Sequence, residues 1–193
     1  RKEFTFKDEI VKECQEVLEC FDNPVALHIR RGDYLINSGN HHNLSLKYYE
    51  EALKYFPDRQ VVIFSDDPEW CLEQLLFVDD RFIVSEGNGP YHDLYLMTKC
   101  SDFIISNSTY SWWGAWLADT GTVIVPNVWF GPNNAHKSLK DLYPSHLFLI
   151  PFSLFLCLCI YLTLYTDLRY SVSIKILFLI LLWNLVLIQS DIV

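Results

Sequence analysis

Residues 25–34 read Val25-Ala26-Leu27-His28-Ile29-Arg30-Arg31-Gly32-Asp33-Tyr34. The first five are apolar apart from one histidine, and a short apolar run of this kind is typical of a strand buried inside a sheet. Two arginines stand directly after the run, where the strand would leave the sheet. Arginine side chains bind phosphate oxygens bidentately and keep their charge at any relevant pH. The segment therefore predicts a buried strand followed by a candidate anion site.

Strand and helix patterns alternate on both sides of this segment. Predicted strands cover residues 25–29, 60–64, 81–85, 103–106 and 122–125; predicted helices cover 8–21, 46–56, 92–100 and 111–118, with a further helix starting at Pro68. Short strands joined through helices predict an α/β fold, in which a parallel sheet carries helices on both faces.

A parallel sheet of this kind binds ligands at the carboxyl ends of its strands. We therefore expect the functional side chains in the segments that directly follow the predicted strands. These segments are 30–33, 65–67, 86–91, 107–111 and 127–131.

The overall charge limits the class of ligand. The formal net charge is −9, which excludes general nucleic-acid binding because that requires a broad basic face. An anionic ligand would need a local positive cluster, and Arg30-Arg31 is the candidate. On spacing alone, a surface turn in which arginine pairs with aspartate is the commoner explanation. A cell-adhesion tripeptide at Arg31-Gly32-Asp33 is disfavoured because it adjoins a core strand.

Two motifs resemble one enzyme family. His28-x-Arg30-Arg31-Gly32-Asp33-Tyr34 after an apolar strand resembles the first signature of the α-1,2-fucosyltransferases. A second stretch, His92-Asp93-Leu94-Tyr95-Leu96-Met97-Thr98-Lys99-Cys100 continuing through Phe103 to Leu117, is similar to the bacterial-type members of that family. The resemblance extends from about residue 25 to residue 143, with both motifs in the expected order.

The resemblance implies a fold and a reaction. The fold would be the C-terminal, donor-binding half of a GT-B glycosyltransferase, which is built from two Rossmann-like domains. The reaction would be inverting transfer of L-fucose from GDP-β-L-fucose to a hydroxyl of a galactoside-containing glycan, without a metal or other cofactor. Arg30 would hold the diphosphate and stabilise the leaving group. The donor-binding set implied for this chain is His28, Arg30, Arg31, Asp93, Asn107, Ser108 and Thr109.

Each of these residues also has a simpler explanation. Without the family, His28 would be a satisfied core histidine, and Asp93 an acid in the first turn of a helix. Helix capping explains one of Ser108 and Thr109 but not the polar cluster at 106–111, whose hydroxyl and N–H groups can bind an anion at a helix N-terminus.

Two features leave catalysis by this chain open. Asp33 is the candidate general base, yet an acid beside two arginines is normally paired with them and is then a weak base. Only about two dozen residues precede the first motif, which is too few for the second domain of a GT-B enzyme. The alternative is a non-catalytic, membrane-anchored remnant that binds a nucleotide sugar.

The composition changes after residue 146, and we predict a domain over 1–146 followed by a hydrophobic tail over 147–193. Residues 147–166 carry no charge and are numerous enough to cross a bilayer as a helix, and 176–188 form a shorter apolar run. The alternative is non-coding sequence translated after a soluble domain. A membrane-associated protein is expected, with its domain in the cytoplasm if bacterial-type or in the Golgi lumen if eukaryotic-type.

Overall fold

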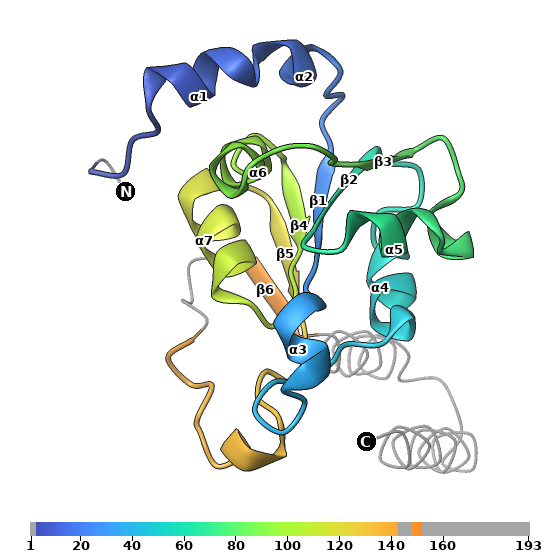
Figure 1. The fold of residues 1–193 in the computed structure, drawn as a ribbon, viewed down its shortest axis with the longest axis vertical. Coiled ribbons are helices and arrows are strands. Elements are labelled where there is room, and N and C mark those ends of the chain that lie inside the picture. The colour runs from blue at the N-terminus through green and yellow to red at the C-terminus, as the bar shows by residue number, and fades with distance from the viewer. Residues whose placement is uncertain (1–2, 143–147, 152–193) are drawn as a thin grey trace, which may run out of the picture. The chain divides into compact units, whose positions relative to one another are not determined.

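One parallel sheet organises the described part of the protein (Figure 1). The computed structural model describes residues 3–142 and 148–151. The strands are β1 Val25–Ile29, β2 Val61–Ser65, β3 Phe82–Val84, β4 Asp102–Ile104, β5 Thr122–Val125 and β6 Phe148–Pro151, in the spatial order β3-β2-β1-β4-β5-β6. Every neighbouring pair is parallel, which confirms the predicted α/β sheet.

Seven α-helices and two short 3₁₀ helices occur in the described residues. They are α1 Asp8–Glu13, α2 Gln15–Glu19, α3 Gly32–Ile36, α4 Leu46–Leu53, α5 Pro68–Leu72, η1 Leu75–Phe77, α6 Pro90–Met97, α7 Thr109–Ala118 and η2 Pro132–Asn134. The single helix predicted over 8–21 is broken at Cys14, which caps α1 and precedes α2. The short helix α3 was not predicted, because five residues give no helical period.

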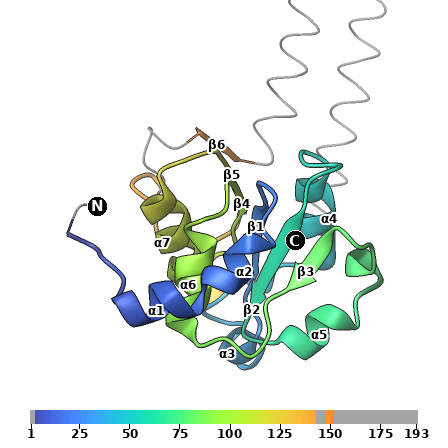
Figure 2. The same cartoon turned by 90° about the horizontal axis from the view of Figure 1, so that it is seen from above.

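The sheet has a separate apolar core on each face, and helices lie on both sides of it (Figure 2). Successive β1 side chains point to opposite faces, so Ala26 joins one core and Leu27 the other. Helices α1, α2, α6 and α7 cover the first face, and α4 and α5 cover the second. Because β1 is buried on both sides, its sequence is a nearly continuous apolar run instead of an alternating pattern.

The strand order creates a switch point between β1 and β4. Going outward from β1, the chain proceeds through β2 to β3, then returns to place β4 on the other side. In a doubly wound sheet, the connections on the two sides of such a point diverge and leave a crevice at the carboxyl ends of the strands. The helices α3, α5 and α7 begin close to this edge, directly after β1, β2 and β4.

The C-terminal region differs from its prediction where it is described. Residues 148–151, expected in the apolar tail, form β6 and pair with β5 in the register Val123↔Leu149. A short apolar run fits a buried strand as well as a helix, so composition alone could not separate the two. The compact unit that holds the sheet extends to Phe152.

The predicted membrane segments otherwise lie outside the described residues, at 152–166 and 176–188. Within residues 3–142 and 148–151, no helix has both the length and the apolar character that a membrane span requires. Association with a membrane through the tail stays a prediction.

We predict that Gly121→Ala destabilises the fold by at least ~2 kcal/mol, because strain and a backbone clash add. Gly121 has φ +69°, and a Cβ there would lie 1.6 Å from the carbonyl oxygen of Ser101, at the turn into β5. Urea unfolding of the two proteins measures the difference. The matched control is Gly87→Ala, at φ +73° with open space around it, which should lose only ~1 kcal/mol. Equal losses would mean that the contact with Ser101 imposes no cost.

Candidate functional site

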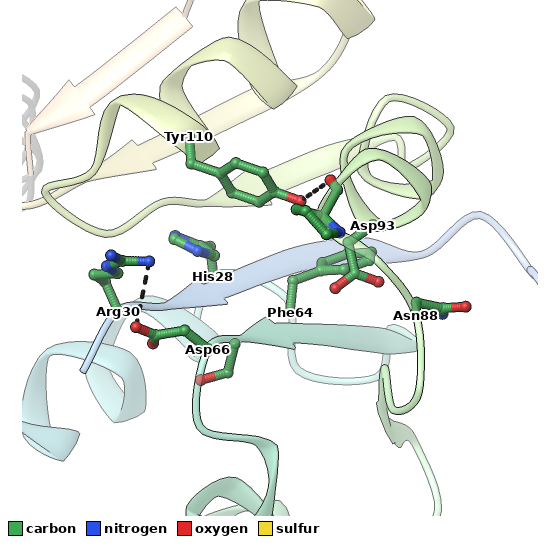
Figure 3. Close-up of a pocket in the computed structure, with 9 residues that line it drawn as sticks. His28, Arg30, Phe64, Asp66, Asn88, Asp93 and Tyr110 are labelled. Carbon is green, nitrogen blue, oxygen red and sulfur yellow. Dashed lines mark hydrogen bonds and ion pairs between the residues drawn. The ribbon is translucent and has the colours of Figure 1, made fainter. Parts of the chain in front are cut away.

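A cavity of about 300 Å³ lies at the carboxyl ends of β1 and β2 (Figure 3). Its walls come from these two strands, from the segment leading into α6, and from the first turn of α7. The lining residues are His28, Arg30, Phe64, Ser65, Asp66, Asn88, Pro90, Asp93 and Tyr110. Arg30 and Asp66 lie toward one end of the cavity, and Asn88 and Asp93 lie toward the other.

His28 forms part of the cavity wall as a buried, neutral side chain. It is 4% exposed, and its Nδ1 lies 2.7 Å from the hydroxyl oxygen of Ser106. Its ring packs against Tyr110 with the ring centres 5.3 Å apart. Burial, with a contribution from the Arg30 charge, lowers the pKa of His28 from 6.5 to about 3. The imidazole is therefore uncharged at any physiological pH.

Arg30 carries the positive charge of the cavity, and two carboxylates compensate it. Its Nη2 and Nε donate to Asp33 Oδ1 at 2.7 and 3.1 Å, and its Nη1 lies 3.3 Å from Asp66 Oδ2. The Arg30 side chain is 33% exposed and that of Asp33 is 57% exposed. Ion pairs this exposed are weak, so an incoming anion can replace Asp33 at little cost.

Asp66 also fixes the chain that carries Arg30. Its Oδ1 accepts a hydrogen bond from the backbone N–H of Arg31 at 2.9 Å. Gly32 leaves room for this carboxylate, because a Cβ at that position would lie 2.4 Å from Asp66 Oδ2. The end of β2 thereby holds the turn that follows β1.

Arg31 points away from the cavity. Its Nε donates to Asp67 Oδ2 at 2.9 Å, and its guanidinium lies over the Trp70 ring, 3.7 Å from the ring centre. Asp67 is also the N-cap of α5 and accepts from the N–H of Trp70. In this arrangement Arg31 joins the end of β1 to the start of α5.

Asp93 supplies a hydrogen-bond acceptor at the far end of the cavity. It lies in the first turn of α6, and Ser85 donates its hydroxyl to Asp93 Oδ1 at 2.6 Å. Burial raises the pKa of Asp93, while hydrogen bonds from Ser85 and Asn88 act in the opposite direction. The residue therefore does more than start a helix, because its carboxylate also lines the cavity.

Three further residues were predicted to bind the donor: Asn107, Ser108 and Thr109. They shape the turn between β4 and α7 and are not among the residues that line the cavity. Asn107 Nδ2 donates to the carbonyl oxygens of His42 and Trp129, each at 2.8 Å, which ties three loops together. Ser108 is the N-cap of α7 and accepts from the N–H of Tyr110. Thr109 is exposed at the first position of that helix.

Six lining residues had no assigned role in the sequence: Phe64, Ser65, Asp66, Asn88, Pro90 and Tyr110. Five of them lie inside the segments expected at the carboxyl ends of strands, and Phe64 directly precedes one, so the positional rule found the region without choosing the side chains. Tyr110 lies inside the second motif, and its hydroxyl donates to the carbonyl oxygen of Pro90 at 2.6 Å. That bond joins α7 to α6 and closes one side of the cavity.

The cavity therefore suits a ligand with an anionic end and a hydrogen-bond-donating end. Arg30 and His28 face the first end, and Asp93 with Asn88 faces the second. Among the described residues, no group of three or more histidine, cysteine, aspartate or glutamate side chains is arranged to hold a metal ion. A nucleoside diphosphate has this distribution of charge and donors.

The buried state of His28 predicts a specific pH dependence of stability. Between pH 6.5 and 3 the unfolded chain takes up a proton that the folded His28 does not, so the free energy of unfolding falls as the pH decreases. At pH 5 the loss is about 2 kcal/mol. Urea unfolding across this range should give a flatter profile for His28→Gln. The exposed His136→Gln is the control and should keep the wild-type slope, whereas parallel profiles for wild type and His28→Gln would contradict the neutral assignment.

Known proteins have sequences similar to a large part of this chain. The O-antigen biosynthesis glycosyltransferase WbnK of Escherichia coli is 41% identical over 130 residues, which is 62% of this chain and 43% of the relative. An alpha-1,2-colitosyltransferase of Escherichia coli is 38% identical over 131 residues, covering 62% of this chain and 45% of the relative. The galactoside alpha-(1,2)-fucosyltransferase 1 of Leontocebus fuscicollis is 32% identical over 146 residues, covering 66% and 40%.

The chain thus spans less than half the length of these curated relatives. The model of the glycosyl transferase family 11 matches residues 1–144, which include every strand from β1 to β5 and the whole cavity. The chain therefore belongs to glycosyl transferase family 11.

Proposed function

We propose that this chain is the donor-binding part of a glycosyltransferase that moves L-fucose from GDP-fucose to a galactoside hydroxyl, with inversion and in α-1,2 linkage. Family membership supports the transfer of a sugar. The names of two relatives contain the α-1,2 linkage, and one of them is a galactoside fucosyltransferase. Because these two names differ in the sugar, the choice of fucose is the part of the proposal that most needs a direct test.

The observation that carries the proposal is Arg30 in the cavity at the switch point of the sheet. Glycosyl transfer builds positive charge on the sugar and negative charge on the departing diphosphate. A guanidinium placed where the diphosphate leaves stabilises that charge without reorganisation during the reaction. Arg30 is the arginine that lines the cavity, and the more exposed of its two carboxylate partners, Asp33, can be exchanged for phosphate.

The other sequence-predicted residues receive proposed roles in the same scheme. His28 and Asp93 would contact the nucleotide, since both line the cavity. Arg31, Asn107, Ser108 and Thr109 would act on the donor through the turns that they order. Asp33 would lose its Arg30 partner when a diphosphate binds, which would free its carboxylate to act as the general base.

The proposed reaction has two further features, which are the absence of a metal and the part that this chain plays in a two-domain enzyme. Transfer would need no metal, and the chain would supply the C-terminal domain of a GT-B pair. The second candidate function is a module that binds the nucleotide sugar without transferring it. Binding of GDP-fucose together with failure to fucosylate lactose would favour this second function.

We predict that Arg30→Ala weakens GDP binding by at least ~2 kcal/mol, or roughly thirtyfold in Kd, because a charge-assisted contact is lost. Titration calorimetry of the full chain with GDP and with GDP-fucose, in EDTA, measures the change and tests metal independence in the same experiment. Lys47→Ala, an exposed lysine on α4, is the control for removing one positive charge and should bind as wild type.

Arg31→Ala separates a direct contact from an indirect one. Because the Arg31 guanidinium is held by Asp67 and Trp70, its loss should weaken GDP binding less than the loss of Arg30. An Arg30→Ala protein that is folded and binds GDP as tightly as wild type would remove the residue on which the proposed function depends.

A further inference from the structure

The side-chain partner of His28 is Ser106, whose hydroxyl has no other hydrogen-bond partner among the described residues. Ser106 is fully buried, and the contact of its hydroxyl with His28 Nδ1 is 2.7 Å long. No other described residue accepts a hydrogen bond from this hydroxyl. The nearby Ser111 differs, because its hydroxyl contacts only the carbonyl oxygens of Ser106 and Ser108.

This isolation decides which nitrogen of His28 carries the proton. If Nδ1–H donated to Ser106, the serine O–H would be a buried donor without an acceptor. Leaving such a donor unpaired costs about 1–3 kcal/mol. If Ser106 donates to Nδ1 instead, the serine donor is satisfied, because an unprotonated imidazole nitrogen is an acceptor. The proton of the neutral ring is then on Nε2.

His28 Nε2 opens onto the cavity. This atom has no hydrogen-bond partner within residues 3–142 and 148–151, and it is not one of the buried polar atoms there that lack a partner, which are Asn43 Oδ1 and His92 Nδ1. Since the ring is among the residues that line the cavity, the exposed edge of Nε2 faces that space. Arg30 comes two residues later, directly after the last residue of β1, so in an extended chain both side chains lie on the same face of the sheet.

We propose that Ser106 is a positioning residue that holds His28 as the Nε2–H tautomer, so that a neutral, fixed hydrogen-bond donor faces a phosphate oxygen of the nucleotide. This Nε2–H group would act beside the charged guanidinium of Arg30. The inference rests on the proposed function for its ligand, a nucleoside diphosphate, but the position of the proton is a property of the free protein.

The test reads the tautomer directly in the full chain. Long-range proton–nitrogen correlation spectra of protein labelled with ¹⁵N-histidine distinguish Nε2–H from Nδ1–H, and His28→Gln identifies the His28 signals. The wild-type protein without ligand should show His28 as the single Nε2–H form at pH 7. An Nδ1–H form, a mixture, or an imidazolium would overturn the proposal without any variant.

Ser106→Ala should release the ring, and Ser111→Ala is the matched control because it removes an equally buried hydroxyl that does not touch His28. The first variant should show a mixture of tautomers, and GDP should bind roughly five- to tenfold more weakly, as expected for one oriented hydrogen bond. The second variant should keep the Nε2–H form. A folded Ser106→Ala protein that keeps the single Nε2–H form would overturn the role of Ser106.

Amide substitutions test the donor itself. His28→Gln can place an N–H near the position of Nε2, whereas His28→Asn can place one only near Nδ1. We expect GDP to bind more tightly to the glutamine variant than to the asparagine variant. Equal affinities, or the reverse order, would overturn the contact with phosphate.

The proposed function and the proposed tautomer of His28 can be disproved separately. Wild-type protein that shows the Nε2–H form but binds no GDP would uphold the action of Ser106 on the ring and overturn both the proposed function and the nucleotide ligand. Wild-type protein that binds GDP with His28 in the Nδ1–H form would uphold the function and overturn this inference.

Discussion

The pairing of β1 with β2 on one side and β4 on the other is the constraint on which the site depends. These parallel pairs fix the carboxyl end of β1 in register with its neighbours, as in His28↔Phe64 and Leu27↔Ile104. Residues that are far apart in the sequence are thereby brought to one edge: His28 meets Ser106 across β1 and β4, and the turn after β1 meets Asp66 at the end of β2. A shift of register by one residue would turn His28 into the opposite core.

The charge of Arg30 is already balanced by carboxylates in the protein without a ligand, so an anion must compete with these carboxylates for the guanidinium. The segment carries two arginines, but Asp33, Asp66 and Asp67 surround them. Binding a diphosphate is therefore an exchange of partners and not the neutralisation of a bare charge. Asp33 is exposed and lies three residues from Arg30 on the same short segment, so it can leave, whereas Asp66 also holds the backbone of Arg31 and is the more firmly placed partner.

The sequence predicted five strands and the edge of the sheet that carries the site, because buried parallel strands have compact apolar runs. It could not predict the partners of the arginines: the pairing of Arg30 with Asp66 and of Arg31 with Asp67 depends on the adjacency of β1 and β2 in space. The strand β6 was predicted to be part of a membrane segment, because an uncharged apolar run fits a buried strand as well as a membrane-spanning helix. Residues 107–109 were predicted to bind the donor because the family resemblance implies it, but their polar groups also satisfy loop carbonyls and cap a helix.

In the proposed complex, His28 and Arg30 would divide the recognition of an anion between two kinds of donor. Arg30 contributes charge, but its side chain is partly exposed and is shared between two acid partners, so no single partner fixes its position. His28 has no charge to contribute, since burial beside Arg30 disfavours the imidazolium. It is instead held by Ser106 and packed against Tyr110, so its orientation is fixed before binding. A fixed neutral donor loses little entropy when it binds, and it can select the geometry of a phosphate that the adjacent charge attracts.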